Sequence, residues 1–167
     1  MYALTDDISS ANSAVGCSAI ELRFSSLREL VPGMCLASAA FAAGPGGGEM
    51  PKVTLVLREL LGNAIEHGNR NDPRREVVCR VTRLGPQSVE LSVTDEGPGF
   101  TADAVALQVL DTPSDTCRGG LRLVNALGDS LRFELGGRRA VCQVSWNSGE
   151  GSPTHFQQPT SGNSGKE

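Results

Sequence analysis

Three polar residues share one side of the clearest helical segment in the sequence. Glu59, Asn63 and His67 are spaced by four residues, so they form one row beside the apolar stripe of the helix. A carboxylate, a carboxamide and an imidazole in such a row can accept a proton, bind a hard metal ion and contact a phosphate. The same spacing is also typical of a solvated helix edge, which is the alternative interpretation.

A second candidate site lies in the segment from Asp95 to Phe100, which reads DEGPGF. An alternating apolar segment ends at Asp95, and Gly97 and Gly99 follow where a side chain would block close approach to the backbone. A carboxylate held in this way can accept a hydrogen bond from an exocyclic amine such as that of adenine. The alternative is a tight turn that carries a solvated aspartate.

A third candidate site is the segment that reads Arg118, Gly119, Gly120 and Leu121 and opens a helix. Free backbone N–H groups at a helix start, glycines and one arginine are the usual components of an anion-binding site. Two adjacent glycines before a helix also occur in simple hinges, so this segment alone is weaker evidence than the other two.

The periodicity of the apolar residues predicts the elements that position these candidates. A period of three and four residues predicts a long helix from Val53 that Gly68 closes, and alternation on both sides of Gly85 predicts a hairpin. Because hairpins require antiparallel pairing, we expect an α+β fold, a two-layer α/β sandwich with helices on one face of a mixed, mostly antiparallel sheet. The other predicted elements are a strand at 20–24, helices at 27–41, 102–110 and 121–127, and a second hairpin with strands at 131–135 and 140–146.

Composition and charge argue against several classes of protein. The net charge of −4 disfavours direct binding to nucleic acid or to an acidic membrane surface. Five scattered cysteines with only two histidines disfavour a zinc site or a disulfide framework. No apolar run approaches the roughly 18 residues of a membrane span. We therefore expect a cytoplasmic protein with a flexible arm at 1–19, one domain at 20–146 and a disordered tail at 147–167.

In their order along the chain, the three candidate sites resemble the N, G1 and G2 boxes of the gyrase, heat-shock chaperone, histidine kinase and MutL (GHKL) ATPase superfamily. The resemblance covers roughly residues 20–146 and implies a Bergerat-type ATP-binding fold. Within the superfamily, Glu59 and the phrases NAIEHG at 63–68 and TDEGPGF at 94–100 look most like the stand-alone serine-kinase anti-sigma factors of bacteria.

The resemblance implies a role for each residue of the first box. Asn63 matches the Mg²⁺ ligand that bridges the metal to the ATP phosphates. Glu59 matches the general base that takes the proton from a partner's Ser or Thr hydroxyl, where histidine kinases commonly carry Asn. His67 is expected either to support the phosphates or to cap the end of the helix.

The second and third boxes imply contacts with the nucleotide. Asp95 matches the residue that recognises the adenine amine, and Gly97 and Gly99 match the glycines that let the base and the neighbouring lid come close. The third box usually reads Gly-x-Gly-Leu, whereas Arg118 stands here in place of the first glycine. Glu66 also stands where histidine kinases often carry Lys, and this short supply of cations predicts slow phosphoryl transfer.

The resemblance also implies cofactors and partners, namely ATP and Mg²⁺, an anti-sigma-factor antagonist as substrate, a sigma factor that the protein sequesters, and a second copy in a homodimer. Two other functions stay open. The protein is then either an ATP-binding interaction module without kinase activity, which the altered third box favours, or a detached histidine-kinase ATPase domain, which Glu59 disfavours.

Overall fold

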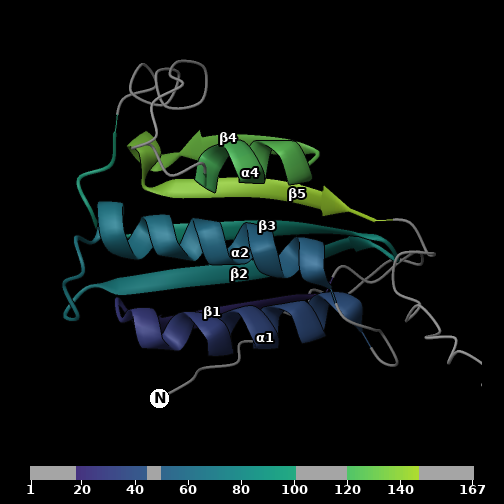
Figure 1. Ribbon diagram of the computed structural model, residues 1–167, viewed down its shortest axis with the longest axis horizontal. Helices are drawn as coiled ribbons and strands as arrows, with labels where there is room; N and C mark the ends of the chain where they lie inside the picture. Colours follow the sequence, from purple (N-terminus) through teal and green to yellow (C-terminus); the bar gives the residue numbers. More distant parts are fainter. Residues whose placement is uncertain (1–17, 45–49, 101–119, 147–167) are drawn as a thin grey trace, which may run out of the picture.

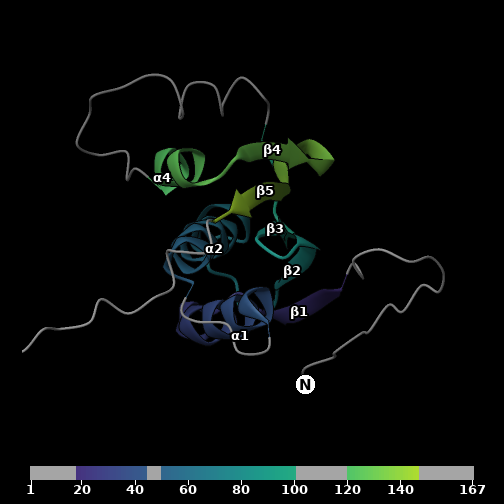
Figure 2. The ribbon, with the colours of Figure 1, turned by 90° about the vertical axis from the view of Figure 1, so that its right-hand side faces the viewer.

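One sheet and one layer of helices make up the described part of the molecule. The computed structural model describes residues 18–44, 50–100 and 120–146. The helices lie on one face of a five-stranded sheet, as Figures 1 and 2 show from two directions. The elements are β1 (Ala19–Ser25), η1 (Arg28–Leu30), α1 (Val31–Ala43), α2 (Pro51–Asn63), η2 (Ala64–Gly68), β2 (Glu76–Gly85), β3 (Ser88–Asp95), α4 (Gly120–Leu127), β4 (Ser130–Glu134), η3 (Leu135–Gly137) and β5 (Arg139–Ser145).

The sheet has the strand order β1-β2-β3-β5-β4. Both predicted hairpins are present, as β2 with β3 and β4 with β5. Every pairing among the described strands is antiparallel, so the sheet is more uniform than the mixed sheet we expected. The α+β sandwich with helices on one face is confirmed.

Alternation along the strands decides which face the helices cover. The central pair Val81 and Leu91 is fully buried, and Leu91 also lies opposite the buried Cys142 of β5. The intervening positions of the strands carry charged side chains on the other face of the sheet, such as Arg80 and Arg132. The core therefore lies between the sheet and the helices, and is made mainly of valine and leucine.

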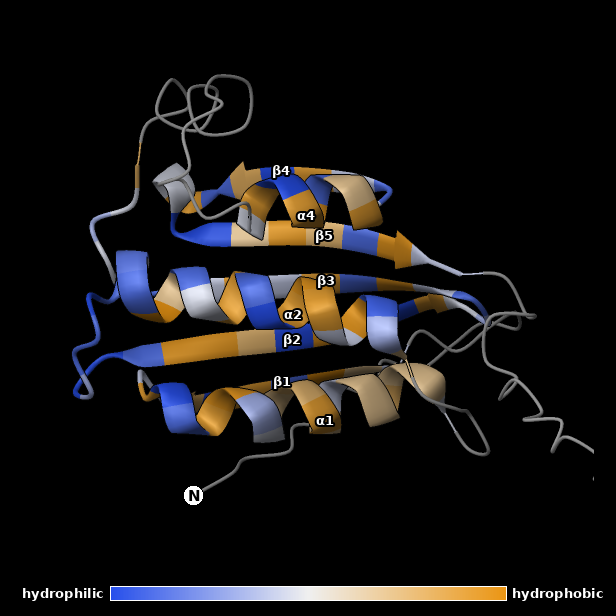
Figure 3. Ribbon diagram, in the orientation of Figure 1, coloured by the Kyte–Doolittle hydropathy of each residue, from blue (hydrophilic) through white to orange (hydrophobic). Residues whose placement is uncertain are grey.

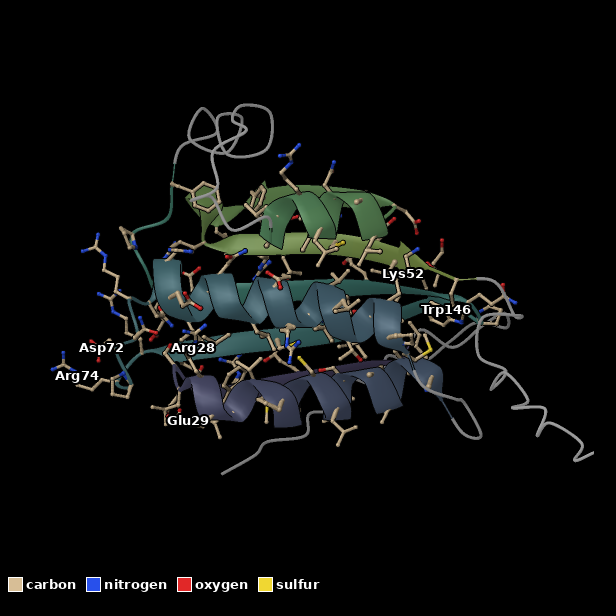
Figure 4. The ribbon with its side chains drawn as sticks, viewed as in Figure 1. Arg28, Glu29, Lys52, Asp72, Arg74 and Trp146 are labelled. Atoms are coloured by element: carbon tan, nitrogen blue, oxygen red, sulfur yellow. The ribbon has the colours of Figure 1, made fainter. Side chains whose placement is uncertain are left out.

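The central helix α2 crosses the middle of the sheet. Its apolar stripe is completely shielded from solvent at Val53, Val56, Leu57 and Leu61. At its start, the Lys52 ammonium donates to the Ser145 carbonyl at 2.8 Å. Lys52 and Trp146 lie together at one end of the molecule, whereas Asp72 and Arg74 lie at the other end, beyond the last turn of the helix (Figure 4). The residues of α2 and η2 thus run from one end of the sheet to the other.

The first predicted helix, 27–41, differs from the observed one. Residues 28–30 form the short turn η1, and α1 begins only at Val31. Proline has no N–H to donate, and the first turn of a helix needs none, so proline is favoured there. The helix accordingly begins at Val31, with Pro32 in its first turn. The observed helix is shorter than the predicted one, and it is still mainly apolar, as Figure 3 shows along α1.

Several expectations lie outside the described residues. They are the helix at 102–110, the segment that contains Arg118 and Gly119, and most of the two predicted tails. Within the described ranges, no helix has the length and apolar composition that crossing a membrane requires.

Candidate functional site

The helix that carries the first candidate residues changes its winding after Asn63. Ala64–Gly68 form a π-helical turn, in which the Asn69 amide donates to the Ala64 carbonyl, five residues earlier, at 2.8 Å. Such turns are frequent at functional sites. Glu59 and Asn63 remain half-buried on α2, whereas His67 lies in the π turn with its side chain exposed. The regular spacing of four does not place His67 in an α-helical row with the other two.

The π turn brings Gly68 against both the Asp95 carboxylate and Gly97. A Cβ atom on Gly68 would overlap that carboxylate, and a Cβ atom on Gly97 would overlap the Gly68 carbonyl. Only glycine permits this approach, because the obstacle at Gly97 is backbone that has no rotamer to change. We call Gly68, Asn69, Asp95 and Gly97 the Asp95 cluster. It joins the first and second candidate sites of the sequence.

The Asp95 carboxylate is held in a defined orientation. Its Oδ1 accepts a hydrogen bond from the Gly97 amide at 2.7 Å, and its own amide donates to the Arg138 carbonyl at 3.0 Å. Burial raises the pKa of Asp95, and the Gly97 N–H, Arg138 and Arg75 act in the opposite direction. Within the described residues Oδ2 accepts no hydrogen bond. A partly desolvated acceptor with one free oxygen is suited to a ligand that brings an N–H donor.

The rest of the DEGPGF segment is attached to the turn between β4 and β5. Gly99 has a φ of 73°, a conformation that favours glycine, and the next amide, that of Phe100, donates to the Gly136 carbonyl at 3.0 Å. The Phe100 ring packs edge-on against Phe133, with centroids 5.0 Å apart. Gly99 therefore serves a contact between two loops in this structure.

The start of α4 packs against Glu59. A Cβ atom on Gly120 would overlap Oε2 of the Glu59 carboxylate. Backbone N–H groups at a helix start carry partial positive charge, so this is a favourable environment for an anion. Glu59, Asn63 and Gly120 form what we call the α2–α4 junction. It joins the first candidate site to the described half of the third, in which Leu121 is half-buried.

The junction contains an amide group with no partner. Nδ2 of Asn63 is buried and makes no hydrogen bond to the described residues. An unmade hydrogen bond of this kind costs about 1–3 kcal/mol, and a ligand that bonds the carboxamide would remove that cost. A carboxamide also offers an oxygen of the kind that Mg²⁺ binds. Among the described residues, no group of three or more His, Cys, Asp or Glu residues is placed to hold a metal.

Sequence reasoning missed three residues around Asp95. They are Asn69, Arg75 and Arg138, of which Asn69 is completely buried. Asn69 follows Gly68, outside the helical pattern, and the two arginines belong to a loop and to a hairpin turn. No motif or period marks such positions, because only the folded chain brings them to Asp95.

The family model described as a histidine kinase-like ATPase domain matches residues 24–146, which include both the Asp95 cluster and the α2–α4 junction. No curated protein matches the chain.

Proposed function

The chain belongs to the histidine kinase-like ATPase domain family, and we propose that it acts there as a serine/threonine protein kinase of the anti-sigma-factor type. Membership makes the domain an ATP-binding domain of the GHKL superfamily. The kinase activity, its protein substrate and its slow turnover are the proposal. The observation that carries the kinase proposal is the position of Glu59. Its carboxylate lies against the first residue of α4, and Glu59 is one turn of α2 from Asn63.

The two parts of the site have different tasks in this proposal. The Asp95 cluster would hold the adenine base, with the carboxylate accepting a hydrogen bond from the exocyclic amine. The carboxamide oxygen of Asn63 would hold Mg²⁺ together with the phosphates, and its buried Nδ2, which has no described partner, would donate to a phosphate oxygen. Bound Mg²⁺ neutralises the charge of the phosphates, as in other phosphoryl-transfer enzymes.

Glu59 would act as the general base for a hydroxyl group of a partner protein. The oxygen of the partner's Ser or Thr forms a bond to the γ-phosphorus of ATP. The bond from that phosphorus to the β–γ bridging oxygen breaks, and ADP leaves with the electron pair. Glu59 takes the hydroxyl proton. A carboxylate is required for this step, because a carboxamide at the same position has no basic oxygen of comparable strength.

The proposed protein substrate is a small anti-sigma-factor antagonist, and the proposed second partner is a sigma factor that the protein sequesters in a homodimeric form. These partners follow from the resemblance to stand-alone serine kinases, which rests on Glu59 and on the segments 63–68 and 94–100. A detached histidine-kinase domain would instead transfer phosphate to histidine, which gives an acid-labile product.

Labelled ATP tests the proposal directly. The purified protein is incubated with Mg²⁺, γ-labelled ATP and the antagonist-like proteins of its own genome. We expect acid-stable label on Ser or Thr of one partner. We expect Glu59→Gln to lower the rate at least about a hundredfold while ATP affinity is unchanged.

Glu90→Gln is the matched control, because Glu90 pairs with Arg132 on the opposite face of the sheet. It should transfer phosphate at the unmodified rate. ATP binding without any transfer to a partner would contradict the kinase proposal and favour a non-catalytic interaction module. Transfer that survives in Glu59→Gln would show that Glu59 is not the base.

A further inference from the structure

Asn69 is a completely buried polar residue at the exit of the π turn. Only three polar side chains among the described residues are buried, and Asn69 and Ser26 are two of them. Burying a carboxamide costs free energy unless its hydrogen bonds are made. The partners that Asn69 uses therefore indicate which parts of the fold it holds in place.

The side chain of Asn69 bonds to three separate segments. Nδ2 donates to Oγ of Ser26 at 2.5 Å and to the carbonyl of Glu76 at 2.9 Å. Oδ1 accepts the backbone amide of Glu96 at 2.8 Å. Two donors and one acceptor are in use, so the plane of the amide is determined by its partners. Asn69 thus joins the end of β1, the start of β2 and the loop after β3.

The bond to Glu96 is the one that bears on the site. Glu96 lies between Asp95 and Gly97, and its own carboxylate accepts the Glu76 amide at 2.7 Å. Two hydrogen bonds therefore hold Glu96 in place, one from its main-chain amide to Asn69 and one to its side chain from the Glu76 amide. Because the Gly97 amide in turn bonds Oδ1 of Asp95, the position of this backbone determines where Oδ2 points.

We propose that Asn69 is a positioning residue, which aims the free oxygen of Asp95 and thereby makes the site selective for a purine that carries an amino group at C6. The inference rests on the proposed binding of ATP at Asp95. Adenine presents an amino group where guanine presents a carbonyl oxygen. An acceptor that is fixed in direction accepts a hydrogen bond from the adenine amino group and repels the guanine carbonyl oxygen. An acceptor that can turn away loses most of this discrimination.

The chain offers a matched control for this role. Ser26 bonds Nδ2 of Asn69, whereas Glu96, the neighbour of Asp95, bonds Oδ1. Ser26→Ala removes one bond of the buried network and keeps the bond from Asn69 to Glu96. If Asn69 only stabilises the fold, both substitutions should affect nucleotide binding in the same way. If Asn69 positions Asp95, only substitution of Asn69 should change the selectivity.

Binding of ATP and GTP is measured by titration calorimetry on the full chain and on Asn69→Ala, Ser26→Ala, Asp95→Asn and the double variant Asn69→Ala with Asp95→Asn, with thermal unfolding in parallel. We expect Asn69→Ala to lower the ratio of ATP to GTP affinity by roughly five- to tenfold, and Ser26→Ala to keep that ratio. In the double variant, the loss at Asn69 should add nothing to the loss at Asp95, because the first acts through the second.

The outcomes separate the inference from the proposed function. No ATP binding by the unmodified chain would overturn ATP binding at Asp95 and the inference with it. ATP binding with an unchanged ratio in folded Asn69→Ala, or an equal change in Ser26→Ala, would overturn the inference alone. Should Asn69→Ala not fold, Asn69→Ser carries the same expectation, because its hydroxyl is too short to reach the Glu96 amide.

Discussion

The two ends of the candidate site differ in how completely their polar groups are partnered. In the Asp95 cluster, the Asn69 amide, the Gly97 amide and the Asp95 amide all have hydrogen-bond partners. At the α2–α4 junction, Nδ2 of Asn63 is buried without a described partner, and the Glu59 carboxylate packs against glycine backbone. Both ends have capacity left for a ligand: the Asp95 cluster offers the acceptor Oδ2 on a carboxylate that the chain holds in orientation, and the junction offers a buried donor.

This difference suggests separate ways of recognition. A rigid acceptor discriminates between bases because a wrong base cannot be accommodated by a rotation. The end that would bind phosphate and metal gains affinity from polar groups whose hydrogen bonds form only with the ligand. Binding then offsets the free-energy cost of burying those groups. The predictions below test whether the Asp95 cluster is the more rigid of the two, from the largest expected effect on stability to the smallest.

Gly97→Ala should have the largest effect. Its Cβ would overlap the Gly68 carbonyl, and backbone cannot move aside as a side chain can. We expect the free energy of unfolding to fall by about 1–3 kcal/mol and ATP affinity to fall at least tenfold. Chemical denaturation and calorimetric titration measure the two losses.

Gly33→Ala is the control for Gly97→Ala, because a Cβ on Gly33 meets nothing within 4 Å and alanine favours a helix. It should leave ATP binding unchanged and stabilise the fold by up to about 1 kcal/mol. Equal stabilities of Gly97→Ala and the unmodified chain would show that the Asp95 cluster can relax.

Gly120→Ala should have a smaller effect on stability and a large effect on phosphoryl transfer. Its Cβ would meet the end of the Glu59 side chain, which can rotate away. We expect a change in unfolding free energy within about 1 kcal/mol, with a transfer rate that falls roughly tenfold to a hundredfold as the carboxylate is displaced. Unfolding and single-turnover labelling provide the comparison, and a larger loss of stability than in Gly97→Ala would reverse the order of rigidity.

Asp95→Asn should have the smallest effect on stability, and the effect is a gain. Burial raises the pKa of Asp95, so the folded state holds that proton more tightly than the unfolded state does, and the ionised carboxylate costs stability above this pKa. The asparagine oxygen can still accept the Gly97 amide. We expect the variant to unfold at a higher denaturant concentration at pH 7, and the gain to shrink as the pH falls through the pKa of Asp95.

The same variant should bind ATP roughly tenfold to a hundredfold more weakly at pH 7, because a charged acceptor is replaced by a neutral one. Unfolding at pH 7 and at about pH 3, below the ordinary aspartate pKa of about 3.9, gives the pH dependence. A gain that is the same at both pH values would mean that the charge on Asp95 is not its cause.

Much of the fold could be predicted from residue periods. The two hairpins and the stripe of α2 follow from alternation and from the three- and four-residue steps, both of which are local properties of the chain. The late start of α1 could not be placed as well, because several apolar residues before Pro32 continue the same pattern. The winding of Ala64–Gly68 was also missed, since a π turn has no sequence signature that separates it from an α-helix.

The site could be predicted in part, residue by residue. Glu59, Asn63, Asp95 and Gly97 were predicted from their types and their order, and all four lie within the residues that the family model matches, while their roles remain predictions. The structure adds Asn69, whose side chain bonds the backbone of Glu96 and the hydroxyl of Ser26, just after a distant strand. Arg118 and Gly119 lie outside the described residues, so their predicted contacts with phosphate remain predictions.

The sequence by itself determined the chemistry that the chain can carry, namely a carboxylate and a carboxamide one helical turn apart and an aspartate followed by spaced glycines. These properties are local, because spacing along a helix or a strand is a matter of a few residues. Only the tertiary structure decided that Gly68 lies against Asp95 and that Gly120 lies against Glu59. It also decided that the buried Asn69 joins the loop after β3 to the end of β1. Such contacts join segments far apart in the chain, and they depend on the packing of the helices on the sheet, which no local period encodes.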